Sequence, residues 1–159
     1  MSTYLTKHFT LEELTTTQVR NVDNFPTSKQ IENLKRICQD GMEPIRAKFG
    51  PIHVNSGFRS LEVNTIIGGS SSSAHMKGLA CDFVPLKKNI TLKEIIFWII
   101  NKSNIKYDQV IAEYWRLNGG WIHIGFSENN KKPRNESLMI GQWTKEKYES
   151  YDPTKVPNL

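Results

Sequence analysis

The hydrophobic pattern of this chain changes period near residue 50, and this change limits what the chain can fold into. Across residues 27–49, apolar side chains recur at steps of three and four, which is typical of one face of a helix. A Gly-Pro pair at 50–51 ends that pattern. Residues 52–56 and 79–84 then predict short strands. Helices followed by strands mixed with helices predict an α+β fold with a small, mostly antiparallel sheet and helices packed on it.

Two threonines mark expected helix starts. Thr10 and Thr91 each have a glutamate three residues later, which is the spacing of a capping box. We therefore expect a short helix after Thr10 and a longer one from Thr91 to about residue 100. Gly41 and Pro44 interrupt the first long helical pattern, so we expect a kink or a split there.

The second half of the chain contains a hairpin pattern. Residues 107–115 and 121–126 flank an Asn-Gly-Gly sequence at 118–120, which predicts two antiparallel strands joined by a short turn. Residues 127–159 are polar with scattered aromatic side chains. We expect them to form a loop and a C-terminal tail.

Length and composition exclude several classes of protein. A chain of 159 residues fits one domain, which we predict over residues 1–159. It has no apolar run near the roughly 18–20 residues of a membrane helix, and its start lacks the layout of a secretory signal. Its charge is only +5, and it contains no zinc-finger, RNP or P-loop pattern, so nucleic acid is not an expected partner. We expect a monomer that is made in the cytoplasm and does not insert into a membrane.

Three residues of metal-binding type stand out by their surroundings. His75 ends a Gly/Ser-rich loop, Asp82 lies within an apolar strand, and His123 lies between apolar neighbours on a hairpin strand. An unpaired carboxylate inside such a strand is costly, so Asp82 needs a compensating partner. A cation would compensate it, and a pair with Arg59 or a helix cap would also do so.

A ten-residue signature contains two of these three residues. Residues 73–82 are Ser-Ala-His-Met-Lys-Gly-Leu-Ala-Cys-Asp, which resembles the S-x-H-x-x-G-x-A-x-D signature of the zinc D-Ala-D-Ala carboxypeptidase and phage endolysin peptidase family. Ser-Gly-Phe-Arg-Ser at 56–60 and Trp-Ile-His at 121–123 resemble two further segments of that family. The resemblance covers about residues 9–126 and implies the fold that this family shares with the hedgehog signalling domain.

The resemblance also implies a set of site residues. His75, Asp82 and His123 would hold a Zn²⁺ ion whose fourth position is left for water. Arg59 would bind a substrate carboxylate or stabilise the oxyanion, unless it forms a structural pair with an acid. Ser73 would hydrogen-bond to substrate or brace His75, and simple capping of the loop is the alternative.

The chain departs from the family in the position of the general base. Many members have an acid three residues before the last histidine, where this chain has Gly120. Glu113 is the candidate replacement. A three-residue loop would put Trp115 opposite His123 and Glu113 on the same face one pair further on, whereas a two-residue loop would send Glu113 to the opposite face. Asp108 is the second candidate.

The resemblance implies a zinc metallopeptidase that hydrolyses amide bonds in peptidoglycan stem peptides, with zinc-activated water as the nucleophile. The expected activity is that of an endolysin-like endopeptidase or a D,D-carboxypeptidase acting on the bacterial cell wall after synthesis in a host cytoplasm. The alternative is a non-catalytic zinc-containing module of the same fold that binds the wall or builds a phage particle. Trp115 and Trp121 are expected to line the substrate site.

Overall fold

A six-stranded sheet forms the centre of the computed structural model, which describes residues 1–157. The strand order is β1-β2-β4-β3-β5-β6. Neighbouring strands are antiparallel except for β3 and β5, which run parallel. The prediction of an α+β fold with a mostly antiparallel sheet is confirmed. The strands are β1 (Ile52–Ser56), β2 (Ala80–Pro85), β3 (Gln109–Arg116), β4 (Gly119–Gly125), β5 (Glu136–Ile140) and β6 (Glu149–Ser150).

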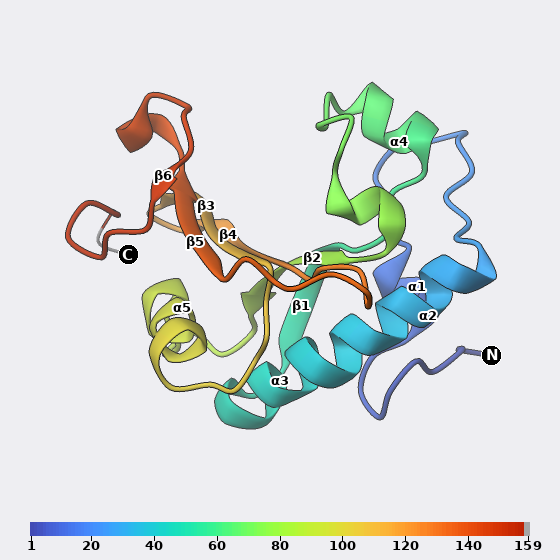
Figure 1. Ribbon diagram of the computed structural model, residues 1–159, viewed down its shortest axis with the longest axis horizontal. Helices are drawn as coiled ribbons and strands as arrows, with labels where there is room; N and C mark the ends of the chain where they lie inside the picture. The colour runs from blue at the N-terminus through green and yellow to red at the C-terminus, as the bar shows by residue number, and fades with distance from the viewer. Residues whose placement is uncertain (158–159) are drawn as a thin grey trace.

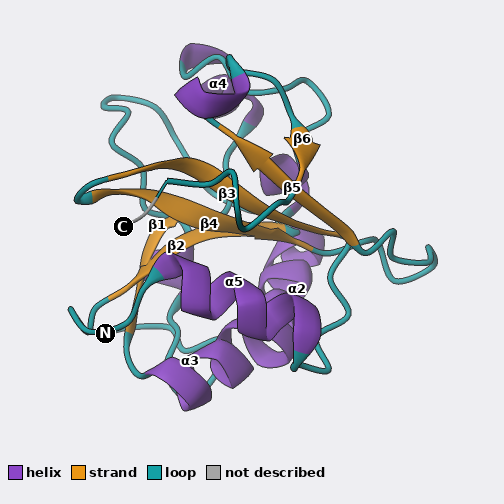
Figure 2. Ribbon diagram, turned by 90° about the vertical axis from the view of Figure 1, so that its left-hand side faces the viewer, coloured by secondary structure: helices purple, strands orange, loops and turns teal. Residues whose placement is uncertain are grey.

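Helices cover the two faces of the sheet unequally. The long helical segments α2 (Ser28–Ile37), α3 (Glu43–Phe49) and α5 (Leu92–Asn101) lie on one face, and the short α4 (Leu61–Ile66) lies on the other (Figures 1 and 2). A further short helix, α1 (Leu11–Leu14), begins near the N-terminus. The 3-10 turns are η2 (Ala74–Lys77) and η3 (Gln142–Thr144). No helix within residues 1–157 is long and apolar enough to cross a membrane.

The expected helix starts and the expected interruption are confirmed. Thr10 and Thr91 both form capping boxes with the glutamate three residues later. Between α2 and α3 the chain forms a π-helical segment, η1 (Cys38–Met42). Gly41 lies in this segment and packs closely against Phe126. A Cβ at position 41 would come within 3.2 Å of the Phe126 ring. The helix therefore changes its winding where it must approach the end of β4 closely.

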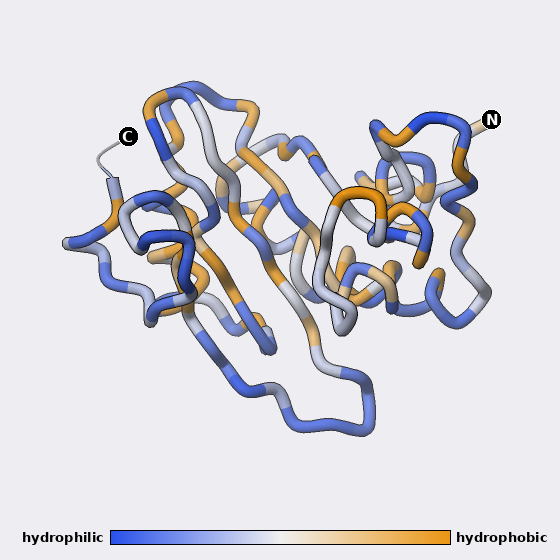
Figure 3. Tube along the Cα trace, turned by 90° about the horizontal axis from the view of Figure 1, so that it is seen from above, coloured by the Kyte–Doolittle hydropathy of each residue, from blue (hydrophilic) through white to orange (hydrophobic). Residues whose placement is uncertain are grey.

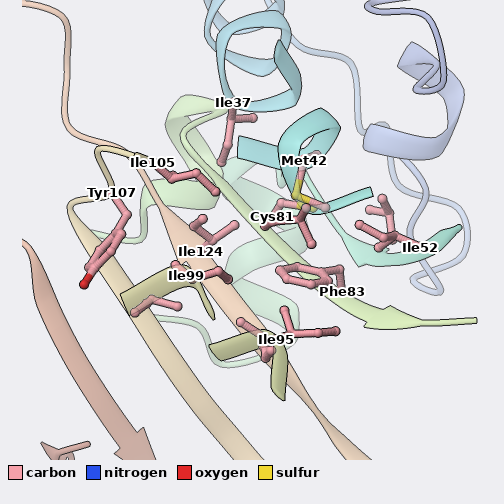
Figure 4. Close-up of a cluster of buried hydrophobic side chains, with 14 of the residues drawn as sticks. Ile37, Met42, Ile52, Cys81, Phe83, Ile95, Ile99, Ile105, Tyr107 and Ile124 are labelled. Carbon is pink, nitrogen blue, oxygen red and sulfur yellow. The ribbon is translucent and has the colours of Figure 1, made fainter. Parts of the chain in front are cut away.

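The face of the sheet under α2, α3 and α5 contains the hydrophobic core. Alternate residues of β2 and β4, such as Phe83 and Ile124, point into it and are fully buried. Figure 4 shows these side chains meeting Ile37 from α2 and Ile95 from α5. Hydrophobic and hydrophilic stretches alternate along the trace through the middle of the molecule, and a long hydrophilic loop extends from its lower edge (Figure 3).

The prediction of a loop and tail over residues 127–159 is wrong for its central part. Residues 136–140 form β5, which pairs along its length with β3, and β6 then pairs with β5. The chain leaves β4, crosses the end of β3 and returns on the far side of it. The pattern missed this strand because Leu138, Met139 and Ile140 are apolar without alternation. Residues 158–159 of the expected tail lie outside the described residues.

Candidate metal centre and active site

Two neighbouring strands and one turn bring the three candidate metal ligands together. Asp82 on β2 and His123 on β4 are directly paired across the sheet, so their side chains share the face that the long helices leave free. His75 reaches the same place from η2. One ligand atom from each residue lies within 4.8 Å of the other two. The Asp82 Oδ1 atom is 2.8 Å from His123 Nδ1 and 3.2 Å from His75 Nε2.

The loop after β1 fixes the orientation of His75. The Gly57 carbonyl lies 2.6 Å from His75 Nδ1, and because a carbonyl only accepts, Nδ1 carries the proton and donates it. The His75 carbonyl accepts in turn from the Arg59 backbone N–H at 3.1 Å. Gly78 allows the chain to leave η2, since its φ of +70° is a conformation that favours glycine. His75 is therefore held as the tautomer whose Nε2 lone pair faces Asp82.

This arrangement leaves two acceptors facing each other without a proton between them. His75 Nε2 is buried and has no hydrogen-bond partner within the described chain, although Asp82 Oδ1 is only 3.2 Å away. Burial lowers the pKa of His75 and so favours the neutral ring, even though Asp82 opposes this. Burial opposes ionisation of Asp82 too, but the hydrogen bond that His123 Nδ1 donates to Asp82 Oδ1 at 2.8 Å favours the ionised form, and the pKa of that carboxyl lies well below its usual range. A neutral imidazole beside an ionised carboxylate calls for a cation.

The donor set fits zinc. Two imidazole nitrogens and one carboxylate oxygen are ligands that Zn²⁺ binds at about 2.0–2.2 Å, which places tetrahedral ligands about 3.4 Å apart. The three ligand atoms lie within 4.8 Å of one another, and the two separations from Asp82 Oδ1, 2.8 and 3.2 Å, are shorter than that value. Three protein ligands are also the number found in catalytic zinc sites.

The hairpin register differs from the expected one, yet Glu113 lies on the expected face. Arg116 pairs with Gly119, so the turn has two residues, and the predicted pairing of Trp115 with His123 is wrong. A regular ladder from this turn would put Glu113 on the core face. A β-bulge between Glu113 and Arg116 adds one residue to β3 and reverses this, so that Glu113 pairs with Trp121 and Ile111 with His123.

Glu113 is held within the field of the metal-binding cluster. One of its carboxylate oxygens, Oε2, accepts a hydrogen bond of 2.7 Å from the Trp121 indole N–H. Burial raises the pKa of the Glu113 carboxyl, and the negative charge of Asp82 adds to this, whereas His123, Trp121 and Arg59 oppose it. A raised pKa moves the carboxyl toward the operating pH of a general base.

Position 120 has no room for the acid that many family members have there. Gly120 has a φ of +91°, and a Cβ on it would come within 2.5 Å of the Trp115 Cα. The backbone of the bulge fills this space. The bulge that turns Glu113 toward the metal-binding face therefore also excludes a side chain at position 120.

Arg59 and Ser73 lie beside the cluster and contact each other. Arg59 Nη2 donates to Ser73 Oγ at 3.4 Å, and Arg59 Nε is buried without a partner within residues 1–157. Burial lowers the pKa of Arg59, and the charges of Asp82 and Glu113 oppose this shift. Ser73 also caps η2 by accepting from the His75 backbone N–H at 3.3 Å. Ser73 thus braces the turn that contains His75.

The second candidate acid, Asp108, is engaged elsewhere. Both of its carboxylate oxygens accept from the Arg134 guanidinium at 2.6–3.1 Å, and Oδ1 also accepts from the Arg134 backbone N–H. The expectation that Trp115 lines the substrate site is wrong as well. Its side chain is 2% exposed and packs in the core, with its ring edge-on to Tyr151.

Comparison with known proteins assigns the family. A family model described as Peptidase M15 matches residues 7–110, more than half of the chain. The chain therefore belongs to the M15 family of peptidases, the family of the zinc D-Ala-D-Ala carboxypeptidases. It is a peptidase by family, with a peptide as substrate and a His-Asp-His cluster suited to a metal. A search of curated proteins found no match.

The family match and the structure account for different parts of the site. The matched residues include Arg59, His75 and Asp82 and end before Glu113 and His123. The tertiary structure brings the last two beside the others. Sequence reasoning missed the Gly57 carbonyl that orients His75, because no side-chain pattern marks a backbone acceptor. It also missed the hydrogen bond from Trp121 to Glu113, which depends on the bulge.

Proposed function

We propose that this protein is a zinc metallopeptidase that hydrolyses amide bonds in the stem peptides of bacterial peptidoglycan. The observation that carries the proposal is the buried Nε2 of His75, which has no hydrogen-bond partner among residues 1–157 and faces the ionised Asp82 across 3.2 Å next to His123. Membership in the M15 family supports hydrolysis of a peptide bond. Glu113 on the same face supports a catalytic rather than a purely binding role.

His75, Asp82 and His123 would hold the zinc ion. Bound there, zinc supplies Lewis-acid polarisation of the scissile carbonyl and lowers the pKa of water. Glu113 accepts the proton of the attacking water and then delivers it to the leaving amine. A carboxyl whose pKa is raised by burial suits both halves of this transfer.

Arg59 is the substrate-binding group in this proposal. Its guanidinium fork matches the geometry of a carboxylate and is held near the cluster by Ser73. A stem peptide that ends in a free carboxylate suits a D,D-carboxypeptidase, and an internal bond suits an endolysin-like endopeptidase. In either case Arg59 stabilises negative charge on the substrate, at its terminus or at the scissile carbonyl. An endolysin of a phage, acting on the host wall, is the form of the activity that we favour.

The test is digestion of purified sacculi and defined muropeptides, with mass spectrometry of the released fragments and zinc analysis of the same sample. We expect cleavage that a chelator abolishes and added Zn²⁺ restores. Glu113→Gln should lower kcat by about 10²-fold or more while one zinc per chain stays bound. The fragment masses identify the bond that is cut.

Asp108→Asn serves as the matched carboxylate control, because Asp108 is paired with Arg134. We expect this variant to cleave at the parental rate. A fully metallated sample that cleaves no muropeptide would contradict the proposal and favour a wall-binding or phage structural module. Parental activity of Glu113→Gln would remove Glu113 from the mechanism and leave the peptidase assignment standing.

A further inference from the structure

We propose that Trp121 is a positioning residue that holds the Glu113 carboxylate in its reactive orientation through the indole N–H. This inference rests on the proposed role of Glu113 as the general base. The two residues are direct cross-strand partners on β3 and β4, and the N–H to Oε2 distance is 2.7 Å. That distance is at the short end of the range for a hydrogen bond from a neutral N–H donor to a carboxylate.

The hydrogen bond engages one carboxylate oxygen and leaves the other available. The indole N–H has a single proton and only donates, so it cannot compete for the proton that Glu113 must accept. Within residues 1–157, no group donates a hydrogen bond to Glu113 Oε1. Trp121 thus fixes the carboxylate through Oε2 while Oε1 remains able to take a proton.

Trp121 is itself held on two sides. Its backbone carbonyl accepts from the Trp115 indole N–H at 2.8 Å. Its ring lies against the Tyr114 ring, with 5.5 Å between the ring centroids and 33° between the planes. Tyr114 lies in the bulge with a φ of +53°, a left-handed conformation that is unusual for a tyrosine. Strained backbone of this kind persists where the surrounding structure supports it, and it often occurs at functional sites.

Glu113 needs such an anchor because charges of both signs surround it. The Arg59 guanidinium attracts its carboxylate, and the Asp82 carboxylate repels it. A glutamate has three side-chain torsions, so without the indole N–H the carboxylate would turn toward the Arg59 guanidinium. Misplacement of a catalytic group by about 1 Å can cost about 10²-fold in rate.

The test is a double-mutant cycle of Trp121→Phe and Glu113→Gln on the zinc-loaded full chain, with muropeptide as substrate. Trp121→Phe keeps an aromatic ring against Tyr114, removes the donor and shortens the ring system. We expect kcat to fall about ten- to a hundredfold with KM within about twofold. In the Glu113→Gln background the same change should alter kcat by less than about twofold, because the group that it positions no longer accepts a proton.

Trp98→Phe is the matched control, since Trp98 packs edge-on against Phe49 on the helical side of the sheet. It should keep the parental kcat. An independent readout is the indole N–H proton resonance of Trp121, which should lie furthest downfield of the four tryptophans and move in Glu113→Gln. An unchanged kcat in Trp121→Phe, or the same loss in both backgrounds, would overturn the positioning role. Parental activity of Glu113→Gln would overturn the base assignment instead.

Discussion

The two faces of the sheet differ in their buried side chains. One face buries apolar groups that pack against each other, and the other buries polar groups whose hydrogen bonding is incomplete. On the helix-covered face, Cys81, Phe83 and Ile124 are fully buried among other apolar groups. On the other face, the neighbouring residues Asp82 and His123 are also mostly buried but are polar and ionisable. His75 reaches this face from η2, and its buried Nε2 has no hydrogen-bond partner in the part of the chain that the structure describes.

This difference separates the sources of stability and of chemistry. Apolar burial on one face supplies folding free energy at roughly 25 cal/mol per Å² removed from water. Buried polar groups with incomplete partners do not supply stability, and they persist because a ligand or a reaction uses them. Adjacent residues of β2 therefore serve opposite purposes, since a strand sends successive side chains to opposite faces.

The largest expected effect is an opposite response of two neighbours on β2. Asp82→Asn should abolish detectable peptidase activity and zinc retention, and it should lower the unfolding free energy of the metal-free protein by about 1.5–3 kcal/mol, because it removes the charged acceptor of the His123 Nδ1–H. Phe83→Ala should lower that free energy by about 3–5 kcal/mol, because it removes a fully buried ring. Urea unfolding of metal-free samples and zinc analysis of each variant measure the two responses. If Asp82→Asn retained one zinc per chain, Asp82 would not be a metal ligand, and the proposed separation of metal binding from core stability would be wrong.

A smaller expected effect tests the β3 bulge, which turns Glu113 toward the metal-binding face of the sheet. Gly120→Ala should destabilise the protein by about 2 kcal/mol or more, because position 120 has a positive φ and a Cβ there would meet the Trp115 backbone. Gly68→Ala is the control. Gly68 also has a positive φ, of +72°, but no atom of the described residues 1–157 lies within 4 Å of the position that a Cβ would take there. Gly68→Ala should lower the unfolding free energy by about 1 kcal/mol. Equal midpoint shifts in thermal unfolding would mean that the bulge tolerates a side chain at position 120.

The smallest expected effect concerns Asp108, whose two carboxylate oxygens both accept hydrogen bonds from Arg134. The Arg134 guanidinium lowers the pKa of Asp108, so this pair stabilises the fold above pH 4 and the contribution is lost as the pH falls through the lowered pKa. Arg134 is more than half exposed, and solvent screening limits the pair to about 0.5 kcal/mol. Arg134→Ala should therefore lower the unfolding free energy by that amount at pH 7 and by less near pH 3. A difference that grows on acidification would contradict this sign.

Local patterns predicted the elements whose side chains alternate or are capped in sequence. The helices after Thr10 and Thr91 follow from capping boxes, and the strand at 52–56 follows from a period of two. The strand β5 was missed, because its apolar run has no alternation and its partner β3 is distant in the sequence. The hairpin register was also missed. A bulge depends on how Gly120 packs against Trp115, which a pattern of residue types does not contain.

The sequence by itself determined the fold class, the helix starts and the three residues suited to a metal. Periodicity, capping and an isolated carboxylate in an apolar strand are local properties of the chain. Only the tertiary structure decided that His75 presents Nε2 to Asp82 and that Glu113 lies beside His123. Both depend on contacts between distant segments, the Gly57 carbonyl in one case and the β3 bulge in the other. Backbone hydrogen bonds and register are settled only when the strands have packed together.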